Sequence, residues 1–339
     1  MLTKPRTTHS AIAWAHTSTP DEYEVITQWP GQSGKDWGKV PSDISYNTGR
    51  SPTPSTANPA ASTSSLAHDP DALAFRWGFE VPATDPQKLS WVKILLDPSQ
   101  PRPTFVQPKK STLPRGKTPV SIVTDYLRAL RAYTLLTLER RLGAEVVERT
   151  PVEYVLTVPA VWSDKARATT LEAAVDAGLG GKEEDGEHGG LRLITEPEGA
   201  AEYALRSLQP NTLKEGDCFT VCDAGGGTVD LITYTITSLH SLQLQEVAVG
   251  TGALCGAVYL DRRFEEFVAE KIGRDRFEAM DHRVKFQMGQ YWETYMKREF
   301  AETAAGDAAA DDDYFWVPVM GVPDTEDGRM RGGFLRVSR

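Results

Sequence analysis

The chain has 339 residues and a formal net charge of −10. This acidic balance, with no local basic patch to offset it, argues against a nucleic-acid partner. The apolar runs are shorter than the ~18 residues that a membrane-spanning helix needs, and Ser10–Ala15 is too short for a signal peptide. Three cysteines are too few for a disulfide scaffold. Cys218 and Cys222 lie four residues apart in an apparent strand, too far apart for a bridge, so we expect both to be buried, reduced thiols. A cytoplasmic protein of one large domain or two to three lobes, with no membrane partner, is expected.

The first half of the chain alternates between periodic and low-complexity stretches. Residues 9–29 read as two strands that are joined by the turn residues "STPDE". Residues 47–70 are rich in Pro, Ser, Thr and Ala, which predicts a flexible loop because little apolar surface is available to order it. Apolar residues recur at helical spacing from Pro119, which predicts a long amphipathic helix that ends at Gly143.

The second half alternates strand and helix patterns, which favours an α/β fold. The first expected elements are a buried strand in 152–162 and a helix with Ser163 as N-cap and Gly178 as terminator. A strand and helix follow in 191–205, with Pro197 near the helix start, and then a glycine-rich hairpin in 218–236. The last expected elements are a strand in 242–249, two long helices from about Leu260, and a final strand pair from 314 onwards.

Two segments of the chain are similar to each other. Thr7–Thr17, "TTHSAIAWAHT", and Gly227–Thr237, "GTVDLITYTIT", both run from small polar residues into a strand, and a further strand follows each. The second copy has a strand before its turn, "CFTVCDA", whereas the first has only "MLTKPR". The pattern predicts two related sheet units, with the opening strand missing from the first.

The stretch "DAGGGTVD", Asp223–Asp230, lies at the tip of the predicted hairpin. Glycine backbone can approach a ligand closely and adopt positive φ, and successive N–H groups in such a turn suit phosphate oxygens. Asp223 and Asp230 would repel bare phosphate, but carboxylates hold Mg²⁺, usually through its waters. The combination therefore favours a metal-bound nucleotide over a free anion.

Other interpretations of this stretch remain open. It is neither a Walker A motif, which ends in Gly-Lys-Ser/Thr, nor a Rossmann fingerprint, because a strand follows the glycines. A tight hairpin that needs positive φ, with solvated carboxylates beside it, would leave the same sequence without a ligand.

The sequence resembles the actin-like ATPase domain of the 70-kDa heat-shock chaperone family. "DAGGGTVDLITYTI" is similar to that family's second phosphate hairpin, and "TTHSAIAWAHTS" to the second half of its first. "EYVLTVPAVWSDKARATTLEAAVDAGL", "LITEPEGAAEYAL" and "VGTGALCGAVYLDRRFEEFV" resemble further segments in the family's order, with Thr195 in place of an Asn and Cys255 in place of a Gly. Details such as "VITQWPG" look like a divergent branch that is common in fungi.

The resemblance implies an actin-like, ribonuclease H-like fold with two lobes of mixed sheet, ATP or ADP with Mg²⁺ as cofactors, and roles for particular residues. Asp223 and Glu196 would orient waters around Mg²⁺, and Asp230 would position the metal or the attacking water; these three are the expected catalytic residues. A helix N-terminus alone would also favour Glu196. The expected phosphate contacts are Gly225, Gly226, Gly227 and Thr228, together with Thr7 and Thr8 from the other lobe. For Thr7 and Thr8 a frayed terminus is the favoured alternative. Lys93 is the nearest candidate for the family's catalytic lysine, although an exposed lysine at a strand edge is the favoured interpretation.

Departures from the family pattern shape the functional expectation. "MLTKPR" supplies neither the Asp nor the Gly of the first hairpin, and no adenosine segment is recognised near the end. We therefore expect an incomplete module: a first lobe in 1–215, the phosphate-hairpin part of a second lobe in 216–262, and a partial helical cap in 263–339. The expected function is nucleotide binding of chaperone type with impaired hydrolysis, with co-chaperones or client proteins as further partners. A non-catalytic interaction module, a truncated gene product, or a sugar or acetate kinase of the same fold are the alternatives.

Overall fold

The computed structural model describes residues 2–5, 8–34, 38–46, 75–99, 113–180, 190–207, 212–239, 242–299 and 314–338. The loop predicted for 47–70 and the candidate Thr7 lie outside these residues. The chain divides into two compact units, Met1–Ala257 and Val258–Arg339, which are described separately. The lobe boundaries expected from the sequence, after residues 215 and 262, remain predictions.

The elements of the first unit are β1 (Leu2–Pro5), β2 (His9–Ala15), β3 (Tyr23–Val25), β4 (Val40–Pro41), β5 (Ile44–Ser45), β6 (Arg76–Trp77), η2 (Gly78–Glu80), η3 (Val92–Leu95), α1 (Pro119–Leu142), α2 (Ala144–Arg149), β7 (Tyr154–Val158), α3 (Asp164–Asp176), β8 (Leu191–Thr195), α4 (Glu196–Ser207), β9 (Cys218–Ala224), β10 (Val229–Ser238) and β11 (Gln243–Ala253). Those of the second are α5 (Ala257–Ile272, its first residue still in the first unit), α6 (Arg274–Ala279), α7 (His282–Thr294), η5 (Met296–Arg298), β12 (Tyr314–Pro318), β13 (Met330–Arg331) and β14 (Phe334–Ser338).

A mixed sheet with the order β3-β2-β1-β7-β8 organises the first unit, and β4 adds to β2. β1 pairs antiparallel with β2 and parallel with β7, and β7 pairs parallel with β8. The prediction that the opening strand is missing is therefore wrong. β1 is a short strand that ends at Pro5, and it lies between β2 and β7, with which it pairs on either side.

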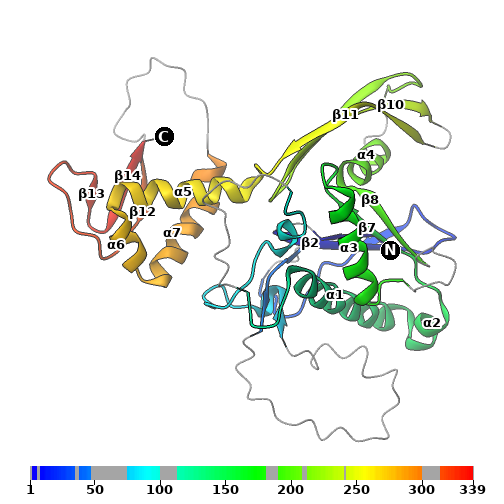
Figure 1. The fold of residues 1–339 in the computed structure, drawn as a ribbon, viewed down its shortest axis with the longest axis horizontal. Coiled ribbons are helices and arrows are strands. Elements are labelled where there is room, and N and C mark those ends of the chain that lie inside the picture. The colour runs from blue at the N-terminus through cyan, green and yellow to red at the C-terminus, as the bar shows by residue number, and fades with distance from the viewer. Residues whose placement is uncertain are drawn as a thin grey trace, which may run out of the picture. The chain divides into compact units, whose positions relative to one another are not determined.

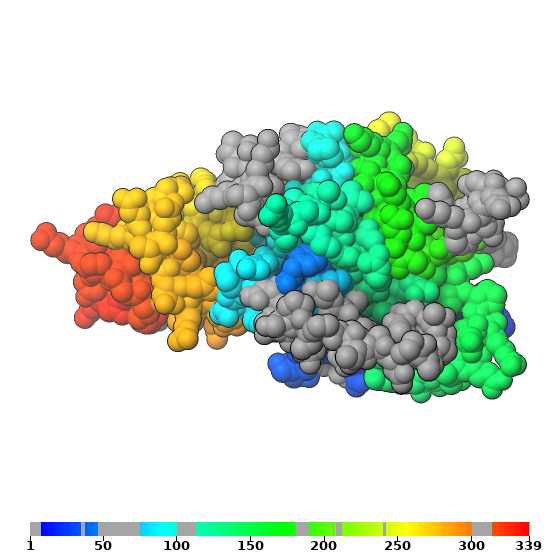
Figure 2. Space-filling view, turned by 60° about the horizontal axis from the view of Figure 1, so that its bottom comes forward, coloured from blue at the N-terminus to red at the C-terminus, as the bar shows by residue number. Residues whose placement is uncertain are grey.

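Helices α1 and α3 lie side by side against one face of this sheet (Figure 1). Thr118 caps α1 by accepting a hydrogen bond from Ser121 N, and the helix ends before Gly143, whose φ is 92°. Ser163 caps α3, so both helix starts and the end of α1 match the sequence-based prediction. The space-filling view shows the surface of residues 75–99, coloured cyan, beside that of α1 (Figure 2). The buried core shared by sheet and helices includes Ile12, Trp77, Ile122, Leu127, Leu130 and Leu156.

The strands β11-β10-β9 form a second, antiparallel sheet. β9 and β10 pair directly, with Asp223 opposite Asp230, which confirms the predicted hairpin. One face is buried through Ile232 and Tyr234, which pack in a cluster with Ala201 of α4. Cys218, Cys222 and Cys255 are free but exposed, so the expectation of buried thiols is wrong.

The second unit has its own core between helices and a small sheet of order β12-β14-β13. Phe264 of α5 stacks on Trp292 of α7 with ring centroids 4.5 Å apart. β12 and β14 pair antiparallel, as the sequence predicts for the final strands. In the part of the chain that the structure describes, no helix is both long and apolar enough to cross a bilayer.

Candidate functional site

The glycine-rich turn between β9 and β10 is closed by a hydrogen bond from Gly225 N to Thr228 O at 2.9 Å. None of Gly225, Gly226 and Gly227 has a positive φ, so turn conformation alone does not explain the three glycines. A Cβ added to Gly226 would lie 2.6 Å from Thr8 Oγ1 and 2.7 Å from Thr8 Cγ2. Glycine is therefore required at position 226 because the backbone lies so close to Thr8 that there is no room for a side chain.

Thr8 belongs to the turn between β1 and β2, which is the counterpart of the glycine-rich turn in the duplicated pattern. The meanders β1-β2-β3 and β9-β10-β11 share one strand order, and their first turns meet at the Thr8–Gly226 contact. The strands on either side of Thr8 are paired, and Thr8 O accepts from Ser42 N at 2.8 Å. The interpretation of Thr8 as part of a frayed terminus is wrong.

Gly256 closes the glycine-rich turn from a third direction. Gly256 N donates to Gly227 O at 3.2 Å, and Ala257 N donates to Gly225 O at 3.0 Å. A Cβ on Gly256 would lie 2.6 Å from the Gly226 carbonyl. Sequence reasoning assigned no role to Gly256, although the match of "CGAVYLD" to a glycine-containing family segment was a usable signal.

Two carboxylates flank the turn on paired strands. Asp223 is 9% exposed and Asp230 is 0% exposed. Val161 N donates to Asp230 Oδ1 at 3.4 Å, while Asp230 Oδ2 is buried and has no hydrogen-bond partner among the described residues. Burial raises the pKa of Asp230, and the charges of Glu196 and Asp223 add to the rise, while hydrogen bonds from Thr228 and Val161 oppose it. Its charged form is thus incompletely compensated.

Glu196 opens α4 and is 5% exposed, and it pairs with Lys93 Nζ of η3 at 2.5 Å. The N-terminus of α4 and the Lys93 ammonium group both attract the Glu196 side chain. Lys93 Nζ also lies 5.4 Å from the centroid of the Trp162 ring. Lys93 is buried and sits on a 3₁₀ helix, so the interpretation as an exposed strand-edge lysine is wrong.

The residues fit a hydrated divalent cation better than a directly ligated one. Within the described ranges, no group of three or more His, Cys, Asp and Glu side chains could hold a metal ion directly. Glu196 and Asp223 nonetheless both act electrostatically on Asp230, whose Oδ2 has no hydrogen-bond partner in the part of the chain that the structure describes. A cation that reaches these carboxylates through its waters would compensate their charge.

No family model matches the sequence. Curated relatives exist, however. "Heat shock 70 kDa protein 12A" of Mus musculus is 28% identical over 181 residues, which is 39% of this chain and 26% of that protein. "Heat shock 70 kDa protein 12B" of Homo sapiens is 27% identical over 213 residues, 47% of this chain and 30% of that protein. "Chaperone protein HscA homolog" of Vibrio atlanticus is 33% identical over 170 residues, 50% of this chain and 23% of that protein.

The chain thus spans less than a third of the length of these relatives. The similarity over about half of the chain supports an Hsp70-like family. The mixed α/β architecture, with its sheets and flanking helices, is compatible with an actin-like ATPase fold of that kind.

Proposed function

We propose that the chain binds a magnesium-bound adenine nucleotide, ATP or ADP, as an Hsp70-like nucleotide-binding protein with impaired hydrolysis. The contact between Thr8 and Gly226 carries this proposal, because it brings the turns of two related hairpins together beside buried carboxylates. Such a pair of turns suits the two sides of a phosphate chain.

The backbone N–H groups of the glycine-rich turn differ in whether they are already used in a hydrogen bond within the turn. Gly225 uses its N–H to close the turn, so in our proposal Gly226, Gly227 and Thr228 supply the N–H groups for phosphate oxygens. Thr8, and Thr7 beside it, would contribute hydroxyls from the opposite turn. Mg²⁺ would neutralise phosphate charge, and Asp223, Glu196 and Asp230 would hold its waters.

Impaired hydrolysis follows from the first hairpin. β1, "LTKP", carries no carboxylate, whereas β9 carries Asp223 at the equivalent place before its turn. Phosphoryl transfer depends on positioning and charge stabilisation from several sides at once. A lost charge-assisted hydrogen bond is worth about 1.5–3 kcal/mol, so we also expect nucleotide binding weaker than about 1 µM.

Titration calorimetry with Mg-ATP and Mg-ADP tests binding, and a single-turnover assay tests hydrolysis. We expect micromolar or weaker binding that Asp223→Ala abolishes and that Asp217→Ala, at the other end of the same hairpin, leaves intact. No Mg-nucleotide binding at millimolar ligand would refute the proposal and favour the non-catalytic interaction module. Hydrolysis above background that disappears in both Asp223→Ala and Glu196→Ala would refute the impairment alone.

The names of the relatives also favour a chaperone role, with co-chaperones or client proteins as partners. Co-purification with and without Mg-ATP tests this part of the proposal. Nucleotide-dependent retention of a protein partner would support it, and the same bound proteins in both states would count against it.

A further inference from the structure

We propose that Asp97 is a positioning residue for Lys93: it fixes the η3 segment against the turn Pro159–Ser163 and so sets where the Lys93 ammonium group lies. This inference rests on the proposed nucleotide-binding function, because Lys93 pairs with the candidate residue Glu196.

Asp97 follows η3 by two residues and is 1% exposed. Its Oδ2 accepts from Ser163 N at 3.1 Å, and its Oδ1 accepts from Ser163 Oγ at 3.2 Å. Ser99 adds hydrogen bonds to Oδ1 from Oγ at 2.5 Å and from N at 3.2 Å. A buried carboxylate with this many donors is held firmly in one orientation. Asp97 therefore ties the chain just after Lys93 to the start of α3.

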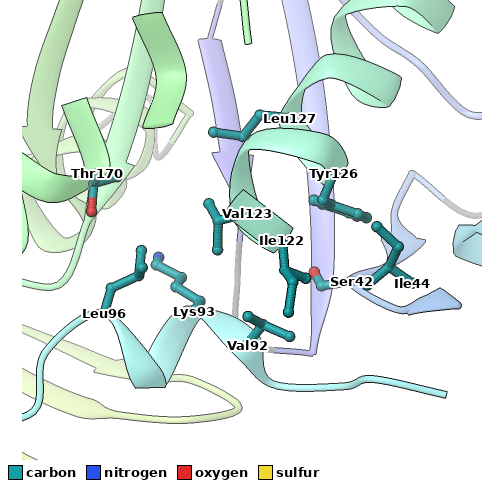
Figure 3. Close-up of a pocket in the computed structure, with 10 residues that line it drawn as sticks. All are labelled: Ser42, Ile44, Val92, Lys93, Leu96, Ile122, Val123, Tyr126, Leu127 and Thr170. Atoms are coloured by element: carbon teal, nitrogen blue, oxygen red, sulfur yellow. The ribbon is translucent and has the colours of Figure 1, made fainter. Parts of the chain in front are cut away.

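The side chains of Val92 and Leu96 are buried in apolar clusters with residues of α1 and α3, but this packing leaves a gap. A small, mostly apolar cavity of about 40 Å³ is lined by residues of η3, α1 and α3. Figure 3 shows Val92, Lys93 and Leu96 of the η3 segment facing side chains of α1 across this space. Residues beside a cavity lack contacts on one side. The hydrogen bonds of Asp97 add a directional contact to this apolar packing.

The backbone at the other end of η3 is also under constraint. Trp91 precedes the 3₁₀ helix with φ 60° and ψ 24°, and it is the one non-glycine residue with positive φ in the described part of the chain. Such a conformation persists where the surrounding structure over-determines it. η3 thus begins after a residue with an unfavourable backbone conformation and lies beside a cavity. The hydrogen bonds of Asp97 hold the chain at the other end of η3.

The turn Pro159–Ser163, to which Asp97 is hydrogen-bonded, contacts two parts of the candidate site. Val161 N donates to Asp230, and the Trp162 ring lies beside Lys93 Nζ. Ser163 then binds Asp97. Fixing η3 to this turn thus fixes Lys93 relative to Asp230 and Glu196, although Asp97 is itself no part of the proposed nucleotide contacts.

The test uses the full chain with Asp97→Asn, which replaces one of the two accepting carboxylate oxygens with an NH₂ group that only donates, so the side chain can no longer accept from Ser163 and Ser99 at both positions. The matched control is Asp85→Asn, since Asp85 also accepts from a serine hydroxyl and a backbone N–H in the same unit. Fluorine NMR of 5-fluorotryptophan protein, with the Trp162 resonance assigned through Trp162→Phe, reports the surroundings of Lys93. Calorimetry with Mg-ATP reports binding.

We expect Asp97→Asn and Lys93→Met to move the Trp162 resonance, and Asp85→Asn to leave it in place. Asp97→Asn should weaken Mg-ATP binding about tenfold in the wild-type background and less than twofold in a Lys93→Met background, because both changes act through one group. If Asp97→Asn fails to fold, Ser99→Ala removes one hydrogen bond and should shift the same resonance in the same direction by less.

An unmoved Trp162 resonance in Asp97→Asn would overturn the inference, as would an equal loss of affinity in both backgrounds. Failure of the proposed function gives a different result. In that case the wild-type chain does not bind Mg-ATP, while the Trp162 resonance still responds to Asp97→Asn and Lys93→Met, which supports the positioning of Lys93 by Asp97.

Discussion

Lys93→Met removes one charge of the buried ion pair and keeps most of the apolar stem. The two side chains are 9% and 7% exposed, and Nζ lies 2.5 Å from Glu196 Oε1. At this separation Coulomb's law with an effective dielectric constant of about 20 gives an attraction of about 7 kcal/mol. Desolvation offsets much of that value, and loss of one partner of a buried pair costs about 3–5 kcal/mol because the other charge is left uncompensated. We therefore expect the free energy of unfolding to fall by about 3–5 kcal/mol.

Urea denaturation followed by tryptophan fluorescence measures this change. Arg149→Met is the matched control, because the Arg149–Glu145 pair is 78% and 75% exposed, and its loss should cost less than about 0.5 kcal/mol. The double variant Lys93→Met/Glu196→Gln should recover more than half of the loss, since no charge then stays buried alone. A destabilisation below about 1 kcal/mol in Lys93→Met, or no recovery in the double variant, would contradict the buried pair described here.

Two further predictions concern Asp230 and Gly256. Because burial raises the pKa of Asp230 above its ordinary 3.8 in the folded chain, the stability contributed by its protonated form is present below that value and is lost as pH rises through the raised pKa. Asp230→Asn should therefore be more stable than wild type in thermal unfolding at pH 7 and show no advantage near pH 3; an equal advantage at both would contradict the assignment. Gly256→Ala places a Cβ 2.6 Å from backbone atoms of Gly226 and should cost about 1–3 kcal/mol. Gly289→Ala, in open space within α7, should be neutral or stabilising by up to about 1 kcal/mol in the same denaturation experiment.

Local signals in the sequence were sufficient for most of the elements. Thr118, Gly143 and Ser163 mark helix ends because caps act within a few residues. The hairpin around the three glycines was predictable because apolar runs of strand type flank the turn, and β9 and β10, which are adjacent in sequence, pair directly. The Hsp70-like family that short motifs suggested is supported by relatives that are 27% and 32% identical over 45% and 49% of the chain.

Features that depend on distant partners were not predictable. β1 has four residues and no alternation of its own, and its pairing with β2 and β7 makes it a strand. Lys93 is buried because its ammonium group pairs with the carboxylate of Glu196, which is 103 residues away in sequence. The exposure of Cys218 and Cys222 has a similar origin, since alternation places both on one face of β9 but does not tell whether that face is covered.

Substitutions at the contact between Thr8 and Gly226 test whether the two hairpin turns lie against each other. Gly226→Ala introduces a Cβ that would lie 2.6 Å from Thr8 Oγ1, 2.7 Å from Cγ2 and 3.2 Å from Cβ. Gly226 has no positive φ, and the three atoms nearest to an added Cβ all belong to Thr8. Overpacking of this kind costs about 1–3 kcal/mol. Thr8→Ala removes the two nearest atoms and leaves the third, which a small shift accommodates. We therefore expect Gly226→Ala to lower the free energy of unfolding, and Thr8→Ala to recover at least half of the loss when it is combined with Gly226→Ala. Denaturation of the two single variants and the double variant gives the interaction energy between the sites. Strictly additive effects would mean that the two turns do not touch, and the arrangement on which the proposed phosphate site depends would have to be abandoned.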